Sequence, residues 1–147
     1  MRQIMLFMAA SLLMATQACS VNVPKEVKDT FAKKFPSVTK VKWSKENDKA
    51  LEAEFKLDGK TESALFSLDG TWMETEEEIA VDVLPQAVKT TLDAKFAKMT
   101  VKECEKVTNS DSSLTYELEI KTLDGVKEVV FNTQGDIIKV EPAGEED

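Results

Sequence analysis

The sequence predicts an α+β fold built from two tandem α-β-β-β-β repeats. Two observations support this prediction. The hydrophobic period changes from about 3.6 residues to 2 along the chain, and the same change occurs a second time. A third observation sets the boundaries, because the first nineteen residues differ in composition from the rest. We therefore divide the chain into a leader over 1–19 and two repeats over 20–82 and 83–147.

Each repeat is predicted to begin with an amphipathic helix. Both helices have an apolar residue at every fourth position and a proline in the first turn, where the missing N–H would have had no partner within the helix. These residues are Pro24, Val27, Phe31 and Phe35 in the first repeat and Pro85, Val88, Leu92 and Phe96 in the second. Lys28 and Lys89, Thr30 and Thr91, and Lys34 and Lys95 match at the same spacing.

Apolar and polar residues alternate after each helix, which is the pattern of a half-buried strand. Short Asp-Gly and Gln-Gly pairs are expected to turn the chain between strands. Because one helix on one small sheet leaves a marginal core, the two repeats should pack with their sheets side by side or as one continuous sheet. We expect strands near 40–46, 50–58, 61–68 and 71–79, then near 100–107, 114–121, 126–132 and 136–141.

The leader has the composition of a secretory signal peptide. Arg2 supplies a positive start, residues 4–14 are apolar and uncharged, and small residues follow. A transmembrane helix needs roughly twenty apolar residues, so this run is too short to be one. We therefore expect export to the periplasm or to the outer membrane.

Cys19 stands directly after the small-residue exit of the leader. This placement favours a bacterial lipoprotein, in which such a cysteine is acylated. Thr16 occupies the position where leucine is usual, so ordinary cleavage between Ala18 and Cys19 is the alternative. With Cys19 acylated, Cys104 is expected to be a small buried hydrophobic residue, whereas a free Cys19 would permit a Cys19–Cys104 bridge.

The composition argues against catalysis and against nucleic-acid binding. The chain has no histidine, which removes the commonest general base and the commonest zinc ligand. Its formal charge of -8 disfavours contact with phosphates. The acidic run over 74–78 lacks the turn and spacing of a calcium loop, and we interpret it as a strand with one charged, solvated face. We expect no enzyme activity, no catalytic or metal site and no cofactor.

Five short motifs occur in order along the first repeat. They are Val23-Pro24 with Val27, Lys34-Phe35-Pro36, Val41-Lys42-Trp43, Glu52-Ala53-Glu54-Phe55, and Leu68-Asp69-Gly70 with Trp72. Together with the duplication they resemble the PepSY-like, beta-lactamase-inhibitor-protein-like family of periplasmic proteins from Bacteroides-type bacteria, over residues 23–141. The second repeat departs from the pattern, with Ala97 in place of the proline and no tryptophan. The resemblance implies helices on one face of an antiparallel sheet and a role in binding or restraining another envelope protein, such as a peptidase.

Three aromatic residues are candidates for partner binding. Trp43, Trp72 and Tyr116 lie in predicted strands, where large aromatics either anchor the core or serve as interface hot spots. The favoured function is a non-enzymatic periplasmic binding module that inhibits or regulates an envelope protein or peptide. The alternative is a small-ligand or ion-binding envelope protein with a pocket between the repeats. Membrane contact is expected only through the lipid anchor on Cys19.

Overall fold

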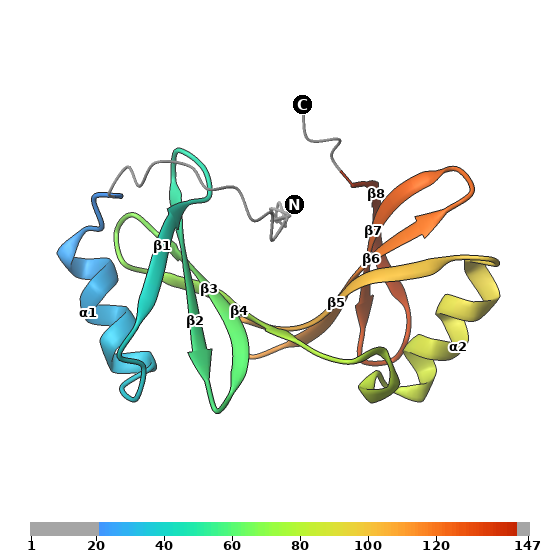
Figure 1. Ribbon diagram of the computed structural model, residues 1–147, viewed down its shortest axis with the longest axis horizontal. Coiled ribbons are helices and arrows are strands. Elements are labelled where there is room, and N and C mark those ends of the chain that lie inside the picture. Colours follow the sequence, from blue (N-terminus) through green and yellow to red (C-terminus); the bar gives the residue numbers. More distant parts are fainter. Residues whose placement is uncertain (1–20, 144–147) are drawn as a thin grey trace.

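The computed structural model describes residues 21–143. Two helices and one eight-stranded antiparallel sheet make an α+β fold (Figure 1). Strands β1 to β8 are neighbours in chain order, so the sheet is a continuous meander. The expected leader over 1–19, with its candidate acylation site Cys19, lies outside the described residues.

The observed elements lie close to the predicted ones. Every strand end lies within two residues of its expected position, and the 3-10 turn η1 is the element that the sequence did not predict. The elements are α1 (Lys25–Lys34), β1 (Val41–Lys45), β2 (Ala50–Leu57), β3 (Lys60–Ser67), β4 (Trp72–Glu78), η1 (Val81–Val83), α2 (Gln86–Lys95), β5 (Thr100–Asn109), β6 (Leu114–Thr122), β7 (Gly125–Asn132) and β8 (Ile137–Pro142).

Both helices begin and end in the same way. Pro24 and Pro85 each stand immediately before the first helical residue, in an extended conformation that leads into the helix. Their carbonyl oxygens accept the first helical hydrogen bonds, over 3.2 and 3.1 Å. At the other end, the N–H groups of Phe35 and Phe96 donate to the carbonyls four residues earlier, and the chain then leaves the helix.

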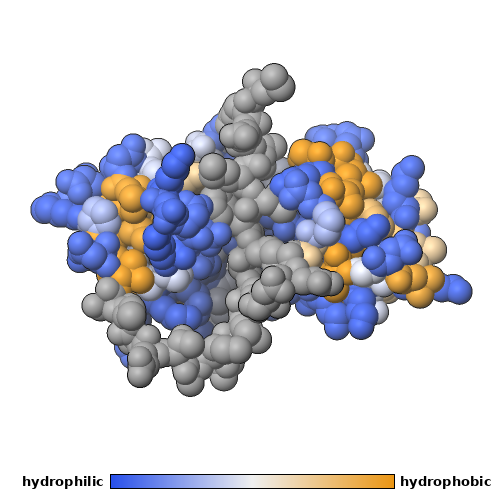
Figure 2. Space-filling view, turned by 90° about the horizontal axis from the view of Figure 1, so that it is seen from above, coloured by the Kyte–Doolittle hydropathy of each residue, from blue (hydrophilic) through white to orange (hydrophobic). Residues whose placement is uncertain are grey.

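Each helix covers its own hydrophobic cluster. Val27 and Phe31 of α1 pack with Ala53, Phe55 and Phe66 of β2 and β3. The cluster beneath α2 contains Val88, Leu92, Cys104, Leu118, Ile120, Val129 and Phe131. The two largest fully buried side chains of the described chain, Phe66 and Phe131, belong to these clusters. The fold therefore has a core at each end of the sheet, and hydrophobic residues are visible at both ends of the molecule in Figure 2.

Strand register puts both clusters on one face of the sheet. Ala53 is opposite Ala64, Ala64 is opposite Thr75, and Thr75 is opposite Thr108. Cys104 is an even number of residues from Thr108 on β5, so both side chains lie on the same face. Figure 1 shows α1 and α2 at opposite ends of the molecule, with β4 and β5 crossing the middle of a strongly curved sheet. No helix within residues 21–143 is long and apolar enough to span a bilayer.

Candidate functional site: a glutamate-rich face of the sheet

The face of the sheet turned away from both helices is rich in glutamate. Cross-strand partners share a face, so the register identifies its members from β2 to β8. The glutamates are Glu52 and Glu54 on β2, Glu74, Glu76 and Glu78 on β4, Glu103 and Glu105 on β5, Glu117 and Glu119 on β6, Glu128 on β7, and Glu141 on β8. We call this surface the glutamate face.

Simple alternation along the strands creates this face. In β2 and β6 the apolar residues other than Ala50 point toward a helix, and glutamates occupy most of the intervening positions. Lysines on the same face lie on the outermost strands or next to a strand end, at Lys42, Lys56, Lys121 and Lys139. Positive charges are therefore scarce in the middle of this face.

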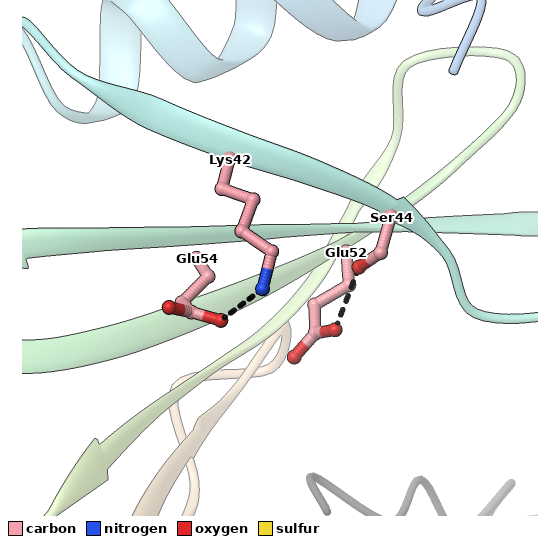
Figure 3. A network of polar contacts seen from close by, with 4 residues as sticks. All are labelled: Lys42, Ser44, Glu52 and Glu54. Carbon is pink, nitrogen blue, oxygen red and sulfur yellow. Dashed lines mark hydrogen bonds and ion pairs between the residues drawn. The ribbon is translucent and has the colours of Figure 1, made fainter. Parts of the chain in front are cut away.

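The edges of the glutamate face have polar partners. On the β1 side, Lys42 Nζ lies 3.3 Å from Glu54 Oε2, and Ser44 Oγ donates to Glu52 Oε2 over 2.9 Å (Figure 3). On the β8 side, Lys139 Nζ lies 2.7 Å from Glu141 Oε2. These pairs are exposed or half-buried, so each contributes little to stability. The glutamates of this face that form ion pairs in the described chain therefore lie at the two edges of the sheet.

The middle of the glutamate face is different, because its central glutamates are buried or half-buried and none of them forms an ion pair within residues 21–143. Glu76 is only 3% exposed, and its Oε2 accepts a 2.8 Å hydrogen bond from Ser63 Oγ. The expectation of a solvated face for the run 74–78 is wrong at this residue. Glu77, the next residue along β4, points to the helix side and forms ion pairs with Lys60 and Lys106. Adjacent and identical side chains thus have opposite surroundings.

Burial raises the pKa of five central glutamates. Loss of hydration is the largest cause in each case, and neighbouring carboxylates add to it, because both disfavour the charged form. The pKa rises to about 7 for Glu74, Glu105 and Glu128 and to about 8 for Glu117. For Glu76 it rises well above the ordinary value. By contrast, the hydrogen bonds from Lys106 and Lys60 lower the pKa of Glu77.

Glu128 has an unused acceptor. The residue is 8% exposed, and its Oε1 atom is buried without a hydrogen-bond partner within the described chain. Its cross-strand neighbours are Glu119 on β6 and Glu141 on β8. A buried acceptor that lacks a donor costs about 1–3 kcal/mol. Glu128 is therefore the position on this face where an incoming N–H donor would contribute most.

The three aromatic candidates lie on the opposite face, with the helices. Trp43 is half-buried, and its ring centroid lies 5.3 Å from that of Phe31. Trp72 donates from Nε1 to Thr75 Oγ1 over 3.0 Å, and Lys34 Nζ lies 3.3 Å above its ring. Tyr116 packs beside the cluster beneath α2. A partner-binding role for these residues stays a prediction.

Cys104 lies on the helix side of the sheet, in the cluster beneath α2. Cys104 is a free cysteine, 4% exposed among apolar neighbours, and burial raises its thiol pKa to about 11. Within the part of the chain that the structure describes, no three His, Cys, Asp or Glu side chains are arranged to hold a metal ion. The sequence signal that could have revealed the site is the repeated glutamate between core positions, which periodicity alone reads as solvent exposure.

Comparisons with known proteins agree with this architecture. The profile of the family described as beta-lactamase-inhibitor-like, PepSY-like matches residues 49–139, which is more than half of the chain. The structure is similar to a BLIP-like protein from Bacteroides fragilis, with a TM-score of 0.73, 18% identity, and coverage of 86% of this chain and 91% of that one. A DUF2874 family protein from Bacteroides ovatus is also similar, with a TM-score of 0.73, 23% identity, and coverage of 80% of this chain and 86% of that one.

A DUF2874 family protein from Bacteroides uniformis is similar to the same degree, with a TM-score of 0.73, 20% identity, and coverage of 80% of this chain and 88% of that one. Identities this low establish the common fold alone. No curated protein matches the sequence. The geometry of the glutamate face must therefore carry the functional argument.

Proposed function

Since this chain belongs to the PepSY-like, beta-lactamase-inhibitor-like family, we propose that it is an exported, non-enzymatic binding module of the periplasm that docks a protein partner on its glutamate face. The observation that carries the proposal is the charge of the side of the sheet on which no helix packs. Both helices pack on the other side, and the central glutamates of the glutamate face are buried or half-buried without forming ion pairs among the described residues. A surface that holds costly buried charge is a candidate for function.

The proposed partner is an envelope protein or peptide, which this module would inhibit or regulate. A sheet face offers a broad, preorganised surface, because hydrogen bonds between strands fix the positions of the side chains. The absence of histidine and the strand location of the acidic residues support binding rather than catalysis. Membership of the family accounts for the fold, whereas the binding role is inferred from the side chains of the glutamate face.

We further propose that the fold arose by duplication, with repeats over 20–82 and 83–147. Two local features recur in both halves. The register shifts between Leu65 and Phe66 on β3 and between Val130 and Phe131 on β7. Gly70 and Gly135 follow these strands with φ of 88° and 84°. They lie against Glu26 and Ala87, which are the second residues of α1 and α2. Shared irregularities of this kind support a common origin.

Position-specific photocrosslinking in the cell envelope tests the docking surface. A photoreactive amino acid replaces Thr115, which lies on the glutamate face of β6, or Ala94, which is exposed on α2. We expect a protein adduct from position 115 and a much weaker one from position 94. Equal adducts from both positions, or an adduct from the helix position only, would reject docking on this face.

The export and anchoring steps need a separate test. If Cys19 is acylated, the intact mass of the protein from its native membrane exceeds that of the processed polypeptide by the mass of the attached lipid. Cys19→Ala should remove that increment and release the protein into the soluble periplasmic fraction. Recovery of an unmodified chain in the cytosol, with residues 1–19 still attached, would contradict export.

A further inference from the structure

We propose that the glutamate face binds a basic polypeptide segment, whose lysine or arginine side chains lie across strands β4 to β7. This inference rests on the proposed function and names the chemistry of the partner. It combines two independent observations, the unbalanced charge of the face and the buried acceptor at Glu128. Both call for positively charged donors.

None of the carboxyl groups at the centre of this face forms an ion pair within residues 21–143, although the positive charge of Lys139 acts on Glu117 and Glu128. The five central carboxyl groups belong to Glu74, Glu76, Glu105, Glu117 and Glu128. The ion pairs of this face join Lys42 to Glu54 and Lys139 to Glu141, at its two edges. A partner that brings positive charge to the middle would therefore complete an incomplete set of interactions.

Glu128 specifies a hydrogen-bond donor rather than charge alone. Its Oε1 atom is buried and accepts no hydrogen bond within residues 21–143. Lysine and arginine supply charged N–H donors, and their bonds to carboxylates are among the stronger hydrogen bonds in proteins. An apolar partner would leave this acceptor unsatisfied and would also keep the neighbouring carboxyl groups from water. The donor requirement thus separates a basic segment from a hydrophobic one.

The spread of the carboxyl groups favours a chain over a single ion. Neighbouring strands lie about 4.8 Å apart, so groups on β4 and β7 belong to rows separated by roughly 14 Å along the sheet. The described residues contain no cluster arranged around one metal ion. Several positive charges carried at intervals along a polypeptide match this spacing, and a compact divalent cation does not.

The titrating groups around this surface predict how binding responds to pH. Neighbouring charges act on the pKa of each central glutamate. The pKa of Glu74 responds to Glu46, and that of Glu76 to Glu74, Glu105 and Glu117. The neighbours of Glu105 are Glu52, Glu78, Glu103 and Glu128; those of Glu117 are Glu74, Glu105, Glu128 and Lys139; and those of Glu128 are Lys139, Glu119 and Glu141. A cationic ligand favours the ionised carboxylates, so its affinity rises as the pH passes through their pKa values. An apolar ligand would show the opposite trend.

A labelled ten-residue lysine peptide is the probe, with the full-length purified protein and fluorescence anisotropy as the readout. At about 50 mM NaCl we expect binding to be about tenfold tighter at pH 8 than at pH 5.5. That ratio corresponds to a bound peptide lowering the pKa of the glutamates by about one unit in total, because each unit changes the binding constant about tenfold. The double variant Glu105→Gln, Glu117→Gln should weaken binding about tenfold at pH 8. It should also be at least as stable as the wild type, which excludes unfolding as the cause.

Two matched controls sharpen the experiment. The variant Glu26→Gln, Asp93→Asn removes the same charge from exposed positions on the helices and should change affinity by less than about twofold. A ten-residue glutamate peptide should not bind. Equal loss of affinity in both double variants, or binding that strengthens at pH 5.5, would overturn the proposal. So would displacement of the peptide by Ca²⁺ or spermidine at equal total charge, because a small cation would then be the preferred ligand.

This experiment and the crosslinking experiment can fail separately. If a protein adduct forms at position 115 but neither the lysine peptide nor the glutamate substitutions affect it, the docking surface stands and the basic partner is rejected. If the peptide binds as expected but position 115 yields no adduct, the chemistry of the face stands and the proposed protein docking fails.

Discussion

Ser63 Oγ donates a 2.8 Å hydrogen bond to Glu76 Oε2 between β3 and β4, and both side chains are buried on the glutamate face. This hydroxyl group is the hydrogen-bond donor to a carboxyl group that lies close enough to Glu105 for their charges to interact. One neutral donor compensates only part of the hydration that a carboxylate loses on burial. The folded state therefore favours the protonated form of the central glutamates.

The first prediction is that stability falls as the pH rises from 5 to 8.5. The folded-state pKa values of Glu74, Glu105 and Glu128 are about 7 and that of Glu117 about 8, all above their ordinary value of 4.5. Their contribution is therefore fully present below about pH 4.5 and is lost as the pH passes through the folded values. Urea unfolding should show a loss of about 2–4 kcal/mol over this range.

The glutamine variant at position 117 separates this effect from other titrations. Glu117→Gln should raise the free energy of unfolding by about 1–3 kcal/mol at pH 8 and by less than about 0.5 kcal/mol at pH 5. Glu26→Gln, exposed on α1, is the matched control and should change neither value by more than about 0.5 kcal/mol. An unchanged pH slope in Glu117→Gln would contradict the assignment. The window stays above pH 5 because Glu77, with its lowered pKa, loses its stabilising ion pairs in more acidic solution.

Local patterns were enough to predict the helices and strands. Val27 and Phe31, or Val88 and Leu92, lie four residues apart, and that spacing specifies one side of a helix whatever surrounds it. Alternation specifies a strand in the same local way. The turn η1 was missed because three residues of a 3-10 helix carry no such period.

The surroundings of the polar residues could not be predicted locally. Alternation places Glu76 and Glu77 on opposite faces, but it does not say which strands lie beside them. Glu77 is paired with lysines from β3 and β5, and Glu76 faces Ser63 instead. That difference depends on pairing between strands that are distant in sequence. The candidate site therefore emerged from the register, although each of its residues is visible in the sequence.

A second prediction concerns two glycines that contact helix backbone. A Cβ at Gly70 would lie 2.8 Å from atoms of Glu26, and one at Gly135 would lie 2.6 Å from the backbone of Ala87. Gly59 has a similar φ of 83° but open space around it. Gly59→Ala should cost about 1 kcal/mol from backbone strain alone, and Gly70→Ala and Gly135→Ala about 1–3 kcal/mol more. Equal losses in all three variants, measured by urea unfolding, would show that the close approach has no energetic effect.

A third prediction is that the Cys104 thiol is unreactive in the folded protein. Burial raises its pKa to about 11, so little thiolate forms at pH 8, and apolar neighbours block access. In a Cys19→Ala background, labelling by a thiol reagent should be at least about a hundredfold slower than in unfolding concentrations of urea. Ser113→Cys in the exposed turn before β6 is the positive control and should react at once. Rapid labelling of both cysteines in the native state would contradict the burial of Cys104.

The last prediction tests whether Trp72 serves the fold. Lys34 Nζ lies 3.3 Å from the centroid of its ring, joining the end of α1 to the start of β4. A double-mutant cycle with Lys34→Gln and Trp72→Leu should give a coupling of about 0.5–2 kcal/mol in the free energy of unfolding. Replacing Lys34 by its exposed neighbour Lys33 in the cycle should give a coupling near zero. A similar coupling for both lysines would mean that general charge, and not the contact, is measured. A specific coupling would mean that the ring already has a partner within the chain, and any protein docking there would have to break that contact.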